Sequence, residues 1–229
     1  MLIKVNIPKI DTFRKFYFIV GSNYSGKSLL GHMLACNENC LYNYSTISPN
    51  KYFNINGGLL EPRNEKLNEL TNEVKKISYF LSGGVNNNEQ ERWLRSDNLK
   101  NYDYIKFQND FIKLLDINIS IDKFYYYWDL CLQNNRLNGK KTEFTVFEIE
   151  NIYSYIDILN KKFKKIKYID ILRTPLDQIK SQKIDILFRG PKKGFTGALS
   201  SQSNVYFQAL SGIIEQHKFN LSNKKYKNF

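Results

Sequence analysis

The sequence predicts an α/β fold built on a central parallel sheet, and three observations carry that prediction. Phe16–Val20 is a run of apolar, mostly β-favouring residues that stops at Gly21, as a strand buried on both faces does. From Lys27 the apolar spacing becomes helical, so a strand, a loop and a helix follow one another. Two further strand–helix units occupy residues 144–182, and strands linked through helices form parallel sheets with right-handed crossovers.

The first elements flank this opening unit. Leu2–Val5 predicts a short edge strand that Pro8 ends, and Cys40–Tyr44 predicts a second short strand after the first helix. The helix itself carries four apolar residues on one side: Leu29, Leu30, Met33 and Leu34.

The middle of the chain, residues 45–141, predicts a mostly helical insertion. A loop over 45–60 precedes a helix that Pro62 opens and whose apolar residues recur at helical spacing: Leu67, Leu70, Val74, Ile77 and Leu81. A loop at 82–88 separates it from helices at Tyr104–Leu115 and Ile121–Leu132. We interpret the aromatic run Phe124–Trp128 as core packing in preference to a substrate platform. Residues 1–229 are thus expected to form a single domain in which 45–141 caps the carboxyl edge of the sheet.

The later elements are regular again. They are a strand at Phe144–Ile149, a helix at Ile152–Phe163, a strand at Ile166–Leu172, a helix from Pro175, a loop at Phe188–Ser203, a helix at Val205–Glu215 and a basic tail.

Charge and cysteine content limit the function classes. The net charge of +12 favours anionic partners, although lysine richness across the whole chain decides nothing alone. Cys36, Cys40 and Cys131 form an odd, unpatterned set, which indicates reduced thiols and no metal site. No leading signal and no apolar run of about 18 residues is present, so we expect a cytoplasmic protein without a transmembrane segment.

The loop between the opening strand and helix has the composition of a phosphate-binding loop. Gly21, Gly26, Lys27 and Ser28 satisfy the pattern G-x-x-x-x-G-K-[ST]. Backbone N–H groups at the helix start would point at an anion, with a lysine for terminal phosphate charge and a hydroxyl able to hold Mg²⁺. We favour this function over a plain tight turn because the pattern lies between a strand and a helix.

A second anion site is predicted at the last strand. Arg173 falls where that strand ends, and Ser181 lies about two turns into the next helix. Equally, Arg173 could pair with Asp170 or Asp177 and Ser181 could be solvated. Two phosphate sites on two strands of one sheet suit a nucleotide phosphorylated at both its 5′ and 3′ ends.

Together these two stretches resemble the sulfotransferase family. IVGSNYSGKSLLGHMLACNEN is similar to the family's 5′ loop, and YIDILRTPLDQIKSQ carries its R-x-P-x-D-x-x-x-S motif. The resemblance covers roughly residues 16–40 and 143–185, and it implies a three-layer, P-loop-like α/β fold. It also implies transfer of a sulfuryl group from 3′-phosphoadenosine 5′-phosphosulfate to a hydroxyl or amine. The implied donor-binding residues are Ser22, Asn23, Tyr24, Ser25, Gly26, Lys27, Ser28, Arg173 and Ser181.

The chain departs from the family at the loop. Tyr24 stands where the family has Lys or Arg, and Lys27 stands where it has Thr. Our hypothesis is that Lys27 supplies the displaced positive charge and acts catalytically. The same lysine makes the loop a nucleoside-triphosphate motif, so a P-loop kinase or nucleoside-triphosphatase using ATP or GTP with Mg²⁺ is the alternative. For that alternative Asp170 is predicted inside its strand, not at the end, and the lid arginines are uncertain. A non-catalytic nucleotide- or nucleic-acid-binding protein ranks third.

A catalytic base is the least determined part of the site. Glu148 and Glu150 share one strand face near the active edge, where some family members carry their base. Both could equally be solvated charges at a strand end, and His32 is interpreted as structural. The expected partners are the nucleotide donor and an unidentified acceptor, whether carbohydrate, peptide tyrosine, lipid or small phenol; nucleic acid is not expected.

Overall fold

The computed structural model describes residues 13–21, 25–43, 49–54, 56–60, 64–81, 102–149, 155–171, 173–174, 176–177 and 180. They form an α/β structure with helices on both faces of a parallel sheet, as predicted. The chain divides into two compact units, residues 1–19 with 28–169 and residues 20–27 with 170–229. Several predictions lie outside the described residues: the strand Leu2–Val5, the loops at 82–88 and 188–203, the helix Val205–Glu215 and the basic tail.

The sheet has four strands in the order β2-β3-β1-β4. Their bounds are Lys15–Val20 for β1, Cys40–Asn43 for β2, Phe144–Glu148 for β3 and Ile166–Asp170 for β4. Both β1 and β2 pair with β3 in parallel, with Lys15 and Cys40 each opposite Phe144. β4 ends at Asp170, so the prediction that this aspartate lies inside its strand is wrong. Aspartate is disfavoured in strands, which agrees with its terminal position.

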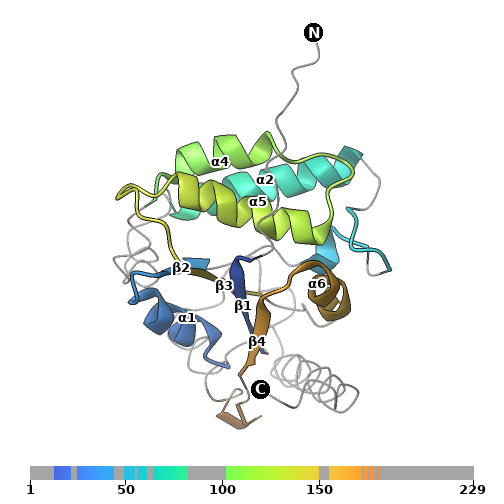
Figure 1. Cartoon of the computed structure of the whole chain (residues 1–229). Helices are drawn as coiled ribbons and strands as arrows, with labels where there is room; N and C mark the ends of the chain where they lie inside the picture. The colour runs from blue at the N-terminus through green and yellow to red at the C-terminus, as the bar shows by residue number, and fades with distance from the viewer. Residues whose placement is uncertain are drawn as a thin grey trace. The chain divides into compact units, whose positions relative to one another are not determined.

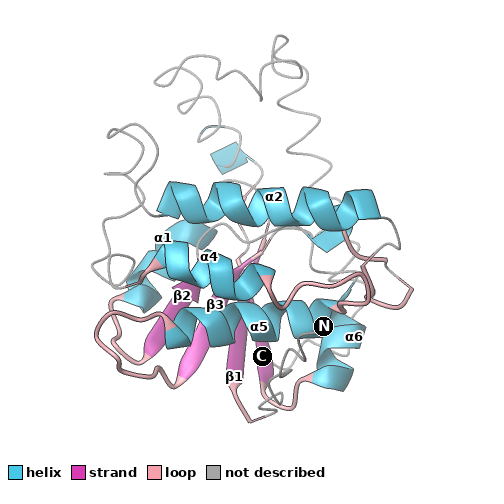
Figure 2. Cartoon of the chain, turned by 90° about the horizontal axis from the view of Figure 1, so that it is seen from above, coloured by secondary structure: helices cyan, strands magenta, loops and turns pink. Residues whose placement is uncertain are grey.

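Three helices of the insertion lie together over one face of the sheet (Figure 1). They are α2 at Asn64–Leu81, α4 at Tyr104–Ile112 and α5 at Ile121–Asn134. Seen from above, α5 crosses the strands, and α4 and α2 lie beside it in roughly the same direction (Figure 2). The described residues of the insertion are mostly helical, as predicted, and they include the short helix η1 at Pro49–Lys51. We also predicted that this insertion covers the carboxyl edge of the sheet, and that position stays a prediction.

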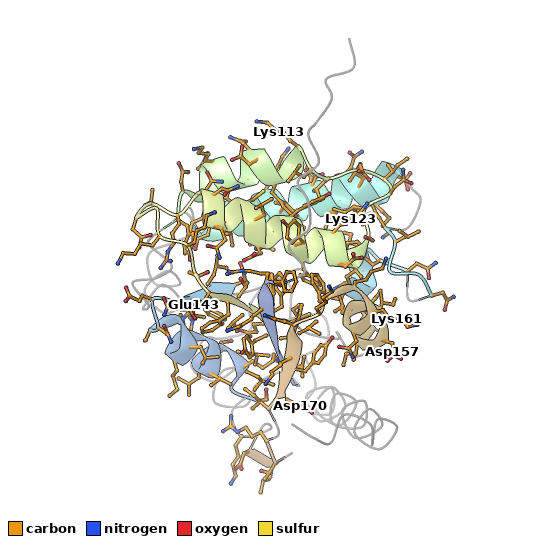
Figure 3. The ribbon with its side chains drawn as sticks, in the orientation of Figure 1. Lys113, Lys123, Glu143, Asp157, Lys161 and Asp170 are labelled. Atoms are coloured by element: carbon orange, nitrogen blue, oxygen red, sulfur yellow. The ribbon has the colours of Figure 1, made fainter. Side chains whose placement is uncertain are left out.

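The aromatic run of α5 is core, which confirms its interpretation from sequence. All five side chains from Phe124 to Trp128 are buried. The Tyr125 ring centroid lies 5.2 Å from that of Phe18 and 5.1 Å from that of Phe147, so α5 packs directly on β1 and β3. Side chains fill the space between α5 and the sheet, while Lys113 lies on the outer side of the helical layer (Figure 3). Offset and edge-to-face ring pairs stabilise such a core beyond their buried area.

The opposite face of the sheet is covered by α1, Lys27–Ala35. Side chains alternate along a strand, so Tyr42 and Asn43 of β2 point to opposite faces. The amide oxygen of Asn43 accepts a hydrogen bond from Trp128 Nε1 of α5 at 2.8 Å. Tyr42 instead lies against Gly31 of α1, where an added Cβ would come within 2.2 Å of the ring. The helix therefore approaches β2 through a glycine.

The apolar side of α1 is not its buried side. Gly31 and Ala35 are buried, whereas Leu29 and Met33 are 68% and 64% exposed. The close approach at Gly31 explains this, because it turns the small residues toward the sheet and the long apolar ones away.

A buried ion pair joins α5 to the segment before β1. Arg14 Nε lies 3.1 Å from Asp129 Oδ2, with side-chain exposures of 12% and 5%. Arg14 Nη2 also donates to Thr145 Oγ1 of β3 at 2.7 Å. Helix α6, at Ile156–Lys162, buries Ile156 and Leu159. Nothing in the sequence pattern predicted the Arg14–Asp129 pair.

Candidate functional site

The two glycines of the phosphate-loop pattern are required by backbone conformation. Gly21, directly after β1, has φ +144°, and Gly26, directly before α1, has φ +104°. L-residues with side chains rarely adopt either value. At Gly21 space is also lacking, because a Cβ would lie 2.8 Å from the Ile171 carbonyl oxygen and 2.9 Å from Ser25 Oγ. Both glycines therefore shape the strand-to-helix turn that the sequence predicted.

Lys27 holds its charge inside this turn. The side chain is buried, and Nζ donates a hydrogen bond to the carbonyl oxygen of Gly21 at 2.9 Å. This hydrogen bond offsets part of the cost of removing the ammonium from water. Ser25 is buried as well, and its hydroxyl has no hydrogen-bond partner in the described part of the chain. Ser22, Asn23 and Tyr24, the rest of the predicted loop, lie outside the described residues.

The predicted second anion motif begins beside the end of β1. The backbone N–H of Ile171, directly after β4, donates to the Val20 carbonyl at 3.0 Å. Arg173 follows two residues later and is exposed. The Thr174 hydroxyl donates to Asp177 Oδ2 at 2.6 Å, and the Asp177 N–H donates back to the same hydroxyl oxygen at 3.3 Å.

This reciprocal Thr174–Asp177 arrangement is that of a helix N-cap, which explains the Thr-Pro-Leu-Asp stretch after Arg173. The turn at Gly21 and the start of the Arg173 motif belong to one compact unit. Ser181, the hydroxyl predicted to act with Arg173, lies outside the described residues.

In the other unit, three side chains meet at the carboxyl end of β3. Glu148 is the last residue of β3, and its Oε1 accepts a hydrogen bond from the Ser28 hydroxyl at 2.8 Å. Its Oε2 accepts one from the Tyr42 hydroxyl at 2.6 Å. Both donors lie on the face that α1 covers, which is the face that strand alternation gives to Glu148. Glu150, the other predicted base, lies outside the described residues.

Tyr42 is the member of this group that sequence reasoning missed. Its strand, β2, pairs with β3 so that Tyr42 lies opposite Val146, two residues before Glu148 on the same face. The ring of His32 lies edge-on to Tyr42 with centroids 5.3 Å apart, and burial lowers the pKa of His32. Tyr42 could have been identified as a partner of Glu148 only from the parallel register of β2 and β3, which is a tertiary property.

The hydroxyls of Ser28 and Tyr42 orient the carboxylate of Glu148, and we call these three side chains the Glu148 group. Each carboxylate oxygen accepts a hydrogen bond from one of the two hydroxyls, which fixes the orientation of the Glu148 side chain. Such a carboxylate can accept a proton from an acceptor hydroxyl, or it can bind the water shell of a divalent cation. Ser28 follows Lys27 directly, so both belong to the first turn of α1.

Within the described ranges, no group of three or more His, Cys, Asp or Glu side chains could hold a metal ion. No helix in the same residues has both the length and the apolar character needed to span a bilayer.

Comparisons with known proteins find a likeness in structure but not in sequence. No protein-family model matches the sequence, and no curated protein matches it. The fold is similar to the crystal structure of sulfotransferase STF9 from Mycobacterium avium, at 14% identity and a TM-score of 0.47. The match covers 93% of this chain and 56% of that chain, so the present chain spans little more than half the length of this neighbour. At this level of similarity, only the residues themselves bear on function.

Proposed function

We propose that the chain is a sulfotransferase that moves a sulfuryl group from 3′-phosphoadenosine 5′-phosphosulfate to a hydroxyl or amine. The observation that carries the proposal is that β1 and β4, the strands leading into the two predicted anion motifs, end beside each other. Ile171 N–H bonds the Val20 carbonyl, and the Ile171 carbonyl lies where a Gly21 side chain would be. Binding one nucleotide with phosphates at both ends would require the loop after β1 and the residues after β4 to lie near each other.

The loop from Ser22 to Ser28 would hold the 5′ phosphosulfate. Backbone N–H groups at the start of α1 favour anions, and the ammonium of Lys27 lies inside the turn. In the proposed reaction Lys27 stabilises the negative charge that develops on the leaving 5′-phosphate. Its present bond to the Gly21 carbonyl is one that a bound phosphate oxygen could replace.

Arg173 and Ser181 would bind the 3′-phosphate of the donor. A guanidinium offers paired N–H donors to a phosphate dianion, and a hydroxyl adds one more. Arg173 lies at the surface, where it is exposed.

Glu148, or alternatively Glu150, would serve as the base. As the acceptor oxygen forms its bond to sulfur, the bond from sulfur to the bridging phosphate oxygen breaks. The acceptor's proton passes to the carboxylate, and 3′-phosphoadenosine 5′-phosphate leaves. The hydrogen bonds from Ser28 and Tyr42 would hold Glu148 in a fixed orientation for that step. The acceptor could be a carbohydrate, a peptide tyrosine, a lipid or a small phenol, and the proposed compartment is the cytoplasm.

One observation favours a second candidate, a P-loop kinase or nucleoside-triphosphatase. The Ser28 hydroxyl, last in the G-x-x-x-x-G-K-S pattern, bonds Glu148 on the strand next to β1. A hydroxyl and an acid in this relation can organise Mg²⁺ beside a triphosphate. In that case the Glu148 carboxylate would bind the ion or its water shell.

Thermal unfolding with ligands separates the two candidates. For a sulfotransferase, 3′-phosphoadenosine 5′-phosphate without Mg²⁺ should raise the melting temperature, and Arg173→Ala and Lys27→Ala should each abolish the shift. Lys123→Ala, which removes an exposed cation from α5, should leave the shift intact and is the control. Stabilisation that requires both ATP and Mg²⁺ would instead support the kinase. Transfer of labelled sulfate to pooled acceptors then tests the chemistry itself, with Lys27→Ala as the inactive control.

A further inference from the structure

Lysines are concentrated where α6 ends and β4 begins. Five of them are exposed: Lys161, Lys162, Lys164, Lys165 and Lys167. Lys15, the first residue of β1, is exposed as well. Between residues 155 and 169 the sequence has a single acid, Asp157, which lies with Lys161 on α6 (Figure 3). Because the lysines far outnumber this one carboxylate, the segment is strongly positive.

An exposed aromatic ring lies within the same surface. Phe16 N–H donates to the Lys165 carbonyl at 2.9 Å, so the start of β1 is held against the start of β4. Phe13, just before β1, is 65% exposed. The Nζ atoms of Lys164 and Lys165 lie 5.1 and 5.6 Å from the Phe13 ring centroid. We name the surface formed by Phe13, Lys15 and the five lysines of residues 161–167 the basic patch.

We propose that the basic patch binds the surface of an anionic phospholipid bilayer. Lysine ammonium groups act as flexible point charges that suit a diffuse layer of headgroup phosphates. An aromatic ring among them can enter the boundary between headgroups and acyl chains. The inference does not depend on the reaction proposed above.

Single-stranded nucleic acid is the other polyanion to consider, and the exposed side chains favour it less. Successive bases need several aromatic platforms, whereas in the described part of the chain Phe13 is the one aromatic among the large exposed apolar side chains. Specific phosphate recognition also favours arginine, whereas every cation of the patch is a lysine.

The patch lies at the sheet edge opposite the Glu148 group. Phe13 and the lysines of 164–167 adjoin the beginnings of β1 and β4, whereas Glu148 ends β3, which runs parallel to β1. Binding a bilayer through the patch would leave Glu148, Ser28 and Tyr42 at the edge that faces away from the lipid.

Vesicle cosedimentation of the full chain tests the proposal. The chain should sediment with vesicles of phosphatidylcholine containing about 30% phosphatidylserine, and not with pure phosphatidylcholine, and salt should weaken binding. The triple variant Lys161→Glu, Lys164→Glu, Lys165→Glu should lower the partition coefficient at least tenfold. A matched triple, Lys75→Glu, Lys76→Glu, Lys106→Glu, makes the same charge change on exposed positions of α2 and α4 and should lower it about twofold or less.

Phe13→Ala should reduce binding severalfold while leaving its salt dependence in place. Equal losses from the two triple variants would overturn the proposal, because they would show that net charge and not the patch binds lipid. Equal binding to neutral vesicles would overturn it too. Patch-dependent binding of a single-stranded oligonucleotide without binding of anionic vesicles would assign the patch to nucleic acid instead.

Discussion

Replacement of Asp129 by alanine should destabilise the fold strongly. The carboxylate lies 3.1 Å from the Arg14 guanidinium, and the two side chains are 5% and 12% exposed. Removing one partner leaves a largely buried cation without its counter-charge, which costs about 3–5 kcal/mol. The free energy of unfolding of a native protein is about 5–15 kcal/mol, so this loss is a large share of the total stability. Urea unfolding followed by circular dichroism measures it.

An exposed ion pair with the same distance between nitrogen and oxygen supplies the control. Lys66 Nζ and Glu69 Oε2 on α2 are also 3.1 Å apart, but their side chains are 25% and 50% exposed. Glu69→Ala should therefore change the free energy of unfolding by no more than about 0.5 kcal/mol. The double variant Arg14→Met, Asp129→Leu should be more stable than Asp129→Ala, since no charge remains buried. Equal effects of Asp129→Ala and Glu69→Ala would refute the reasoning, because burial would then not determine the cost.

Three further predictions concern other buried groups. Gly31→Val should cost about 1–3 kcal/mol in urea unfolding, because its Cβ would overlap a tyrosine ring of β2; no loss would mean that α1 shifts freely. One thiol per native chain, Cys36, should react with Ellman's reagent at pH 8 and all three in denaturant, because burial raises the pKa values of Cys40 and Cys131 to about 12. Burial lowers the pKa of His32 in the folded state, so the unfolded chain binds a proton first and stability should fall as pH drops below about 6.5. His32→Gln should lessen that fall, and an unchanged pH profile would contradict it.

Local patterns were sufficient for the strand, turn and helix around Gly21. The apolar run of β1, the two positive-φ glycines and the helix from Lys27 are all encoded by neighbours in sequence. The same holds for the aromatic face of α5, where bulky rings at helical spacing had to be core.

Packing between distant elements was not predictable in this way. The apolar residues of α1 suggested that their side of the helix is the buried one. Leu29 and Met33 are nevertheless exposed, because Gly31 lets the helix approach Tyr42 closely. Arg14 and Asp129 are 115 residues apart, so no spacing rule links them. Of the two predicted bases, the described residues include only Glu148, and its Tyr42 partner follows from strand register alone.

The pairing of β1 with β3 has a consequence for how the chain acquires its structure. Lys15 lies opposite Phe144, so the central ladder joins segments separated by the whole helical insertion. During synthesis the first strand must wait, unpaired and apolar, until β3 has left the ribosome. Pairings of such long range form slowly, and an exposed strand of this kind is prone to aggregate in the meantime. Efficient production of this chain should therefore benefit from low temperature or from a chaperone that shields β1.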